Sequence, residues 1–176
     1  MEIQKMESLL NITQKDLPLL VVSDNLRSWV SARIKKHTHG GYNHLMWMVE
    51  PGKFITQEFP FLIERPVEYF FDGYRIKLWH NPNWTPLQKI KITTMLAKRL
   101  RAPWYKKIYD PLQIVGIRLG VRWLQIPGIR ICSDHSDILK DIEPDWNFKT
   151  GPSPEEINRY LETRPEYKVF GRYMED

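Results

Sequence analysis

An apolar stretch and an alternating stretch joined by a tight turn constrain the fold of this chain most strongly. The first spans residues 44–49 and the second spans residues 54–59, with Glu50-Pro51-Gly52-Lys53 between them. Proline followed by glycine is typical of a β-turn, because proline fixes its own φ and glycine accepts a positive φ. The pattern therefore predicts a β-hairpin with His44 near its open end.

Further strands and helices can be assigned on both sides of this hairpin. Strands are predicted at 17–22, 61–67, 74–79 and 169–173, and shorter helices at 29–34 and 110–117. Thr85-Pro86-Leu87-Gln88 and Ser153-Pro154-Glu155-Glu156 each combine a capping box with proline at the first helical position. The first capped helix is predicted to run to about Leu100 and the second to about Thr163. The order of elements indicates an α+β fold in which helices pack against an antiparallel sheet.

The first capped helix carries a recognisable apolar stripe. Leu87, Ile90, Thr94 and Ala97 recur at the spacing of one helix face. We therefore expect this stripe to be the apolar face of the helix.

Length and composition favour one globular domain. The 176 residues are 42% hydrophobic and 12% aromatic, which argues against disorder and allows a sizeable core. We expect a polar lead-in at 1–16, followed by a single domain at 17–176. No internal repeat or low-complexity segment interrupts it.

Charge and cysteine content narrow the class of protein further. The chain has a net charge of +5 and a single cysteine, which excludes an intrachain disulfide and a tetrathiolate zinc site. No apolar run reaches the roughly 18 residues of a membrane-spanning helix, and the start lacks the pattern of a signal peptide. The expectation is a cytoplasmic protein without a transmembrane helix.

The only cysteine, Cys132, stands at the start of a predicted helix that extends to about Ile142. Unpaired amide groups and the positive end of the helix dipole stabilise a thiolate at that position. A nucleophile also needs a base within hydrogen-bond reach. His44 is a candidate, because a strand beside the Gly40-Gly41 loop could aim its imidazole at a helix start. The alternative is a buried structural cysteine, which is common for a lone free thiol.

The combination of these segments resembles a known family. Gly41-Tyr42-Asn43-His44-Leu45-Met46-Trp47-Met48, followed far downstream by Ile131-Cys132-Ser133-Asp134, is similar to the circularly permuted branch of the NlpC-type papain-like cysteine hydrolases. In that branch the histidine strand precedes the cysteine helix. Asn43 stands where the family usually has serine, and Asp134 where it has glutamate. The resemblance extends in order over most of the chain and implies a permuted papain-like fold, with the sheet as an antiparallel layer or half-barrel.

The resemblance also implies roles for individual residues. Cys132 would be the nucleophile, His44 the general base, and a polar residue on the next strand would orient the imidazole. Backbone N–H groups of Cys132 and Ser133 would bind the oxyanion of an acyl-enzyme reaction. Relatives act on cell-wall peptides, lipid acyl groups or other amides, so a peptide, amide or acyl-ester substrate is implied and no cofactor or metal is expected.

The orienting residue is Thr56 or Gln57, depending on how the hairpin is paired. A strict family count favours Thr56. With Pro51 and Gly52 as the central turn residues, however, Glu50 pairs with Lys53 and Met46 pairs with Gln57, which makes Gln57 a diagonal neighbour of His44. We therefore expect Gln57 to orient the ring, unless a bulge shifts the register by one residue.

Two other functions remain open at this point. A non-catalytic binding module could hold an anionic polymer through basic runs and the aromatic residues Trp79, Trp84, Trp104 and Tyr105. The basic residues are scattered and no nucleic-acid motif is present, so no specific nucleic acid is expected. A metal site made of His37, His39, His44 and Cys132 is a weaker alternative. The sequence does not indicate an oligomeric state.

Overall fold

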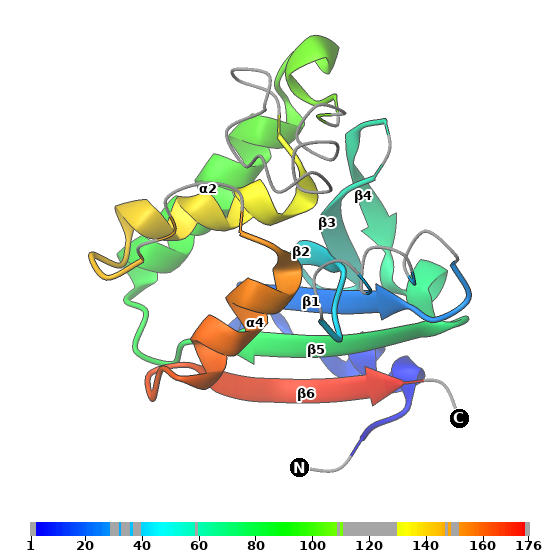
Figure 1. Cartoon of the computed structure of the whole chain (residues 1–176). Helices are drawn as coiled ribbons and strands as arrows, with labels where there is room; N and C mark the ends of the chain where they lie inside the picture. Colours follow the sequence, from blue (N-terminus) through cyan, green and yellow to red (C-terminus); the bar gives the residue numbers. More distant parts are fainter. Residues whose placement is uncertain are drawn as a thin grey trace.

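A six-stranded antiparallel sheet forms the centre of the molecule (Figure 1). The computed structural model describes residues 3–28, 32, 36, 40–58, 60–108, 110, 130–146, 148 and 152–174. The strands are β1 (Leu19–Asn25), β2 (His44–Glu50), β3 (Lys53–Gln57), β4 (Leu62–Pro66), β5 (Tyr74–His80) and β6 (Lys168–Met174), in the order β4-β3-β2-β1-β5-β6. Every pairing in this sheet is antiparallel, so the expected α+β class with an antiparallel sheet is confirmed.

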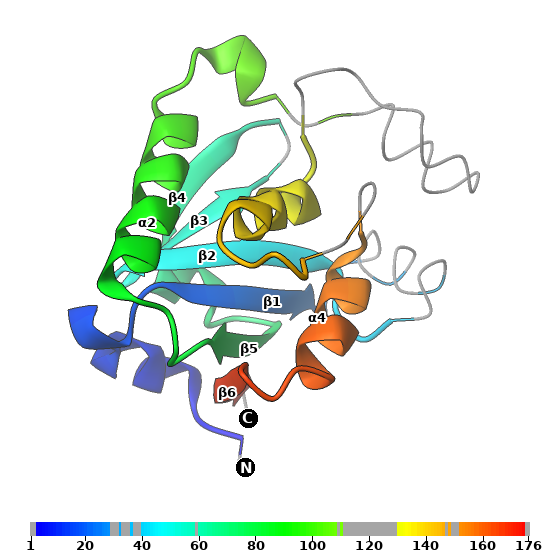
Figure 2. The same ribbon diagram turned by 90° about the vertical axis from the view of Figure 1, so that its left-hand side faces the viewer.

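Helices cover both faces of the sheet (Figures 1 and 2). The helices are η1 (Met6–Asn11), η2 (Gln14–Asp16), η3 (Val67–Phe70), α2 (Pro86–Leu100), η4 (Trp104–Lys106), η5 (Cys132–Asp141) and α4 (Pro154–Glu162), where η marks a 3₁₀-helix. One core packs α2, η5 and α4 against Leu20, Trp47 and Ile55. A second core, on the opposite face, packs η1 and η3 against Val21 and Met46. The alternation of side chains along each strand therefore assigns each residue to one of two buried layers.

The N-terminal stretch is part of the folded unit. Met6, Leu9 and Ile12 are buried in the second core. A bridge between Gln4 and Tyr173 also ties this stretch to β6. Residues 6–16 thus cover one face of the sheet, although the sequence suggested a polar lead-in.

Both capping boxes are present as predicted. Thr85 Oγ1 accepts the Gln88 N–H at 3.3 Å while the Gln88 side chain accepts the Thr85 N–H at 2.8 Å. Ser153 and Glu156 exchange the equivalent bonds at 3.2 and 2.7 Å. These reciprocal bonds satisfy amide groups that a helix start leaves open, which explains why α2 and α4 begin where they do.

The prediction of which face of α2 is its apolar, packed face is wrong. Ile92 and Leu96 are fully buried against the sheet, whereas Leu87 and Ile90 are 75% and 61% exposed. The helix sequence carries two apolar stripes on opposite sides, and tertiary packing selects the one with Ile92 and Leu96. Leu87 and Ile90 are left on the surface.

The hairpin forms at the predicted turn, but its register is shifted. Glu50 pairs with Lys53 as expected, and Gly52 has a φ of 74°. Beyond the turn, Trp47 pairs with Ile55 and Met46 with Thr56, because the pairing shifts by one residue between Trp47 and Glu50. This bulge inserts one extra residue into β2 and overturns the predicted pairing of Met46 with Gln57.

Some expectations concern residues outside the described part of the chain. The predicted helices at 29–34 and 110–117 fall there almost entirely. His37 and His39, which the metal hypothesis needs, also lie outside it.

Candidate active site

Cys132 is the first residue of η5 and is 3% exposed. The Asp134 carboxylate accepts the N–H of Ile131 at 3.0 Å, which fixes the backbone just before the cysteine. The helix is 3₁₀ throughout, whereas the sequence pattern predicted the wider α-helical period. Residues three apart lie directly above one another in such a helix, so His135 stands one turn above Cys132.

η5 is held against β2 by a buried hydrogen bond. Trp47 Nε1 donates to the carbonyl oxygen of His135 at 3.2 Å. Arg99 of α2 donates to Asp137 at 2.7 Å, and Arg130 pairs with the same carboxylate. The start of η5 is therefore fixed relative to the hairpin strands, in front of which it lies in Figure 2.

His44, the first residue of β2, is bonded to Thr56. Its Nε2 lies 2.5 Å from Thr56 Oγ1. Thr56 is fully buried on β3 and reaches His44 because the bulge pairs Met46 with Thr56. The family count that favoured Thr56 thus identifies the ring's partner, and the hairpin count that favoured Gln57 is corrected.

Burial controls the charge of His44. It lowers the pKa of His44 to about 4, and the negative charge of Glu58 opposes this shift. An imidazole with such a pKa is neutral at physiological pH, which is the form that can accept a proton.

Gln57 bonds a different histidine. Its Oε1 lies 3.1 Å from His135 Nε2, and its Nε2 donates to the carbonyl oxygen of Lys107 at 2.8 Å. Arg99 Nη1 lies 3.2 Å from His135 Nδ1, and a guanidinium can only donate. His135 must then carry its proton on Nε2 and accept on Nδ1. Burial lowers the pKa of His135 well below its ordinary value, and the charges of Arg99 and Arg130 lower it further.

His135 is therefore a neutral, fully bonded histidine. Both ring nitrogens have a partner, and the nitrogen that could accept a proton is occupied by Arg99. Although it stands one turn from Cys132, this ring is poorly placed to act as the base. No sequence signal identified Arg99 as its partner, because 36 residues separate the two.

The two histidines bond to consecutive residues of β3, whose side chains point to opposite faces of the sheet. His44 and Thr56 alternate in step with Met46, whereas Gln57 lies on the side of η5 with His135. Nevertheless a charge on His44 lowers the pKa of His135, so the two rings interact electrostatically. His44 is the first residue of β2 and pairs with Ser23 of β1.

The loop before His44 is clamped to the start of α4. Glu155 Oε2 accepts the N–H groups of Gly41 and Tyr42 at 2.8 and 3.1 Å. A Cβ on Gly40 would lie 2.5 Å from the Glu155 side chain, so only glycine allows this close approach. Glu155 stood out in the sequence only as part of a capping box, yet it fixes the chain that leads into His44.

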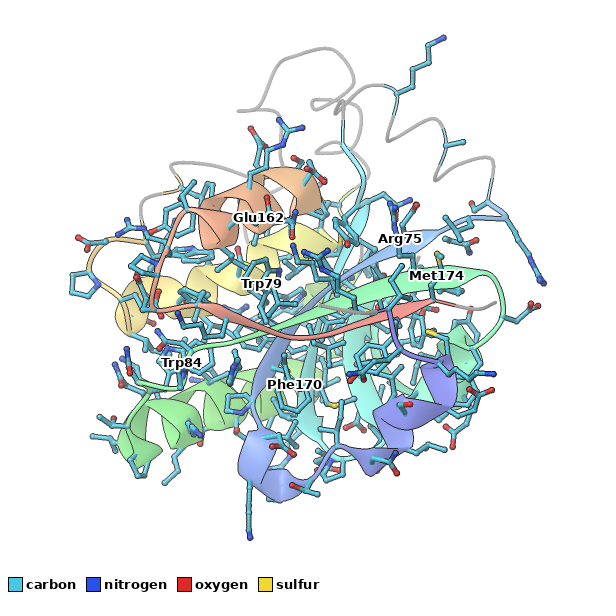
Figure 3. All side chains as sticks on the ribbon, turned by 90° about the horizontal axis from the view of Figure 1, so that it is seen from below. Arg75, Trp79, Trp84, Glu162, Phe170 and Met174 are labelled. Carbon is cyan, nitrogen blue, oxygen red and sulfur yellow. The ribbon has the colours of Figure 1, made fainter. Side chains whose placement is uncertain are left out.

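Two of the four aromatic candidates for polymer binding, both labelled in Figure 3, lie in the interior. Trp79 and Trp84 are buried and donate to Asn158 and Glu143, so neither can stack on a polymer. Among the residues that the structure describes, no group of His, Cys, Asp and Glu is placed to hold a metal ion. None of the described helices is both long and apolar enough to cross a membrane.

The buried imidazole makes stability depend on pH. The pKa of His44 falls from 6.5 in the unfolded chain to about 4 in the folded chain, so the unfolded chain binds more protons between these values. We expect the free energy of unfolding to decrease as pH falls from 6.5 to 4, by about 3 kcal/mol from His44 alone. Urea unfolding of wild type and His44→Gln at both pH values measures this. An equal pH dependence in the two proteins would show that folding does not lower the pKa of His44.

Comparison with known proteins does not assign a family. No family model matches the sequence, and a search of the curated proteins finds no match.

Proposed function

We propose that the protein is a cysteine hydrolase or acyltransferase of the permuted papain-like, NlpC type. Cys132 is the nucleophile, His44 the general base and Thr56 the residue that orients His44. The observation that carries the proposal is the bond between His44 Nε2 and Thr56 Oγ1, at 2.5 Å, on a histidine whose pKa of about 4 keeps it neutral. A neutral, oriented imidazole on the strand beside the cysteine helix is what a thiol nucleophile requires.

The bond to Thr56 determines which nitrogen acts as the base. In the proposed tautomer, Nε2–H donates to the Thr56 hydroxyl and Nδ1 carries the free lone pair. Nδ1 takes the proton from the Cys132 thiol as the sulfur attacks an ester or amide carbonyl. The protonated ring then gives this proton to the leaving alcohol or amine, and water or another acceptor releases the acyl group.

The start of η5 supplies candidates for binding the oxyanion. The first N–H groups of a helix have no acceptor within it, which favours the Cys132 and Ser133 amides. The Ser133 hydroxyl is also fully buried and has no hydrogen-bond partner among the described residues. A buried hydroxyl without a partner calls for an explanation, and a developing oxyanion beside Cys132 would provide an acceptor.

The most direct test is to trap the acyl-enzyme. The protein is mixed with p-nitrophenyl esters of short and long fatty acids and with a p-nitroanilide peptide, and its intact mass is recorded. We expect a mass increase of one acyl group, located at Cys132 by peptide mapping and absent from Cys132→Ala. Product release without an adduct at Cys132, at a rate unchanged in Cys132→Ala, would contradict the proposal.

The roles of Thr56 and Gln57 can be separated by matched substitutions. Thr56→Val keeps the shape of the side chain but removes the bond to His44, so we expect about a tenfold loss of kcat/KM, with Thr56→Ser retaining activity. Gln57→Leu leaves His135 and Lys107 without their partner, so we expect about 2 kcal/mol lower stability and unchanged turnover per folded molecule. Turnover lost in Gln57→Leu but kept in Thr56→Val would show that the orienting residue is Gln57.

A further inference from the structure

The surface of α2 that faces away from the sheet is unusual for an exposed helix face. Its outer stripe consists of the exposed residues Leu87, Ile90, Lys91, Thr94, Lys98 and Arg101. At 100° per residue these six positions span about 100° of the helix circumference, opposite the buried Ile92 and Leu96. Two large aliphatic side chains, 75% and 61% exposed, thus share one surface with three cations.

Two exposed aromatic residues follow the end of the helix. Trp104 and Tyr105 of η4 are 66% and 52% exposed, and their rings contact each other edge to face at 6.1 Å. Figure 2 shows η4 just past the upper end of α2, along the same edge of the molecule. Exposed aliphatic residues thus lie toward the start of α2 and exposed aromatic residues just past its end, with exposed cations between them.

The charged side chains of this segment are all positive. No Asp or Glu occurs from residue 81 to residue 109, the segment that holds α2 and η4, while the same segment contains seven Lys and Arg. Lys98, Arg101 and Lys106 are exposed, and Lys91 also donates to the carbonyl oxygen of Asp141. Asp137 of η5 pairs with Arg99, and Asp141 lies beside Lys91, but Lys98, Arg101 and Lys106 leave an excess of positive charge that attracts an anionic partner.

We propose that the outer stripe of α2, together with Trp104 and Tyr105, docks on the surface of an anionic lipid bilayer. Exposed Leu and Ile would enter the boundary between headgroups and acyl chains, Trp and Tyr would lie at headgroup level, and Lys and Arg would meet the lipid phosphates. A nucleic acid would use the cations and the aromatic rings but gives no partner to the aliphatic pair. The helix would lie on the membrane and not cross it.

The side of α2 that faces the sheet explains why the outer stripe can remain exposed. Ile92 and Leu96 already satisfy the packing of α2 against the sheet. Leu87 and Ile90 are therefore not part of this core, and their side chains remain available to a partner outside it.

Binding is measured by sedimentation of the full chain with vesicles. Vesicles of phosphatidylcholine mixed with phosphatidylglycerol are compared with vesicles of phosphatidylcholine alone. We expect binding to the anionic vesicles and weak binding to the neutral ones. Raising the salt from about 0.1 M to about 1 M shortens the Debye length from about 10 to about 3 Å and should weaken binding strongly.

Paired variants separate the two contributions. Leu87→Gln/Ile90→Gln should reduce the partition coefficient at least about tenfold, whereas Ile3→Gln/Leu10→Gln, which changes exposed aliphatics elsewhere, should not. Lys98→Gln/Arg101→Gln should lose about fivefold per charge, and Lys53→Gln/Lys168→Gln much less. The tryptophan emission should shift to shorter wavelength on binding, and this shift should be reduced in Trp104→Phe.

Two results would overturn the proposal. One is the absence of binding to anionic vesicles at low salt. The other is full retention of binding by Leu87→Gln/Ile90→Gln, which would reveal a purely electrostatic surface suited to a polyanion such as nucleic acid. Cys132→Ala should bind vesicles like wild type, so this result is independent of the proposed chemistry.

Discussion

Cys132→Ala is expected to abolish turnover and leave the fold intact. The thiol is the nucleophile of the proposed reaction, and removal of a catalytic nucleophile lowers kcat by about a millionfold in a comparable hydrolase. The side chain is small, so its loss should lower the free energy of unfolding by only about 1 kcal/mol. Turnover of the esters, circular dichroism and thermal unfolding measure both effects.

The single cysteine of the chain makes this substitution easy to interpret. Cys132 is the only cysteine, so no second thiol can replace it and any residual thiol chemistry would come from a contaminant. If Cys132→Ala unfolds the protein, the buried thiol is structural and the catalytic proposal fails.

His44→Ala is expected to lower kcat/KM by about a thousandfold, because a positioned general base contributes factors of this size. Added imidazole should restore part of the lost turnover in His44→Ala, since a small base can enter the space left by the ring. A purely structural histidine would not show this rescue. His80→Ala is the matched control, because His80 packs its ring against Phe170 at the other end of a strand and takes no part in the proposed site.

Turnover of His44→Ala close to that of wild type would exclude His44 as the base. Among the residues that the structure describes, His135 would then be the candidate base one turn from Cys132, and its bond from Arg99 would have to break for it to accept a proton.

Local signals in the sequence were sufficient to predict where α2 and α4 start and where the hairpin turns. The two capping boxes locate the starts of α2 and α4, because the reciprocal bonds depend only on residues three apart. The Pro51-Gly52 turn locates the hairpin, because its φ requirements are also local. These features do not depend on the rest of the chain.

The predictions that were wrong concern features that depend on tertiary packing. The extra residue of β2 lies where Trp47 packs under η5 and Met48 packs in the second core. No residue within 44–49 predicts a bulge at this place. The choice between the two stripes of α2 likewise depends on the sheet. The 3₁₀ form of η5 is accompanied by bonds from Trp47 and Arg99, which are distant in sequence.

The same distinction applies to the candidate site. His44 and Cys132 could be named from the sequence because their residue types and local contexts are distinctive. Thr56 and Gln57 are adjacent, so a shift of one residue exchanges their roles. Glu155 supports the loop before His44 from more than one hundred residues away, and no local pattern predicts that contact.

The coupling of His44 to Cys132 is tested most directly by the rate at which a small neutral reagent such as iodoacetamide alkylates Cys132 at different pH values. A thiol and an imidazole that share one proton react as a unit, whichever atom holds it. In wild type we expect the rate to fall only as pH approaches the His44 pKa of about 4. In His44→Ala the rate should instead rise with pH up to the ordinary thiol pKa of about 8.5. A wild-type rate that itself titrates near or above 8.5, unchanged by His44→Ala, would contradict the account.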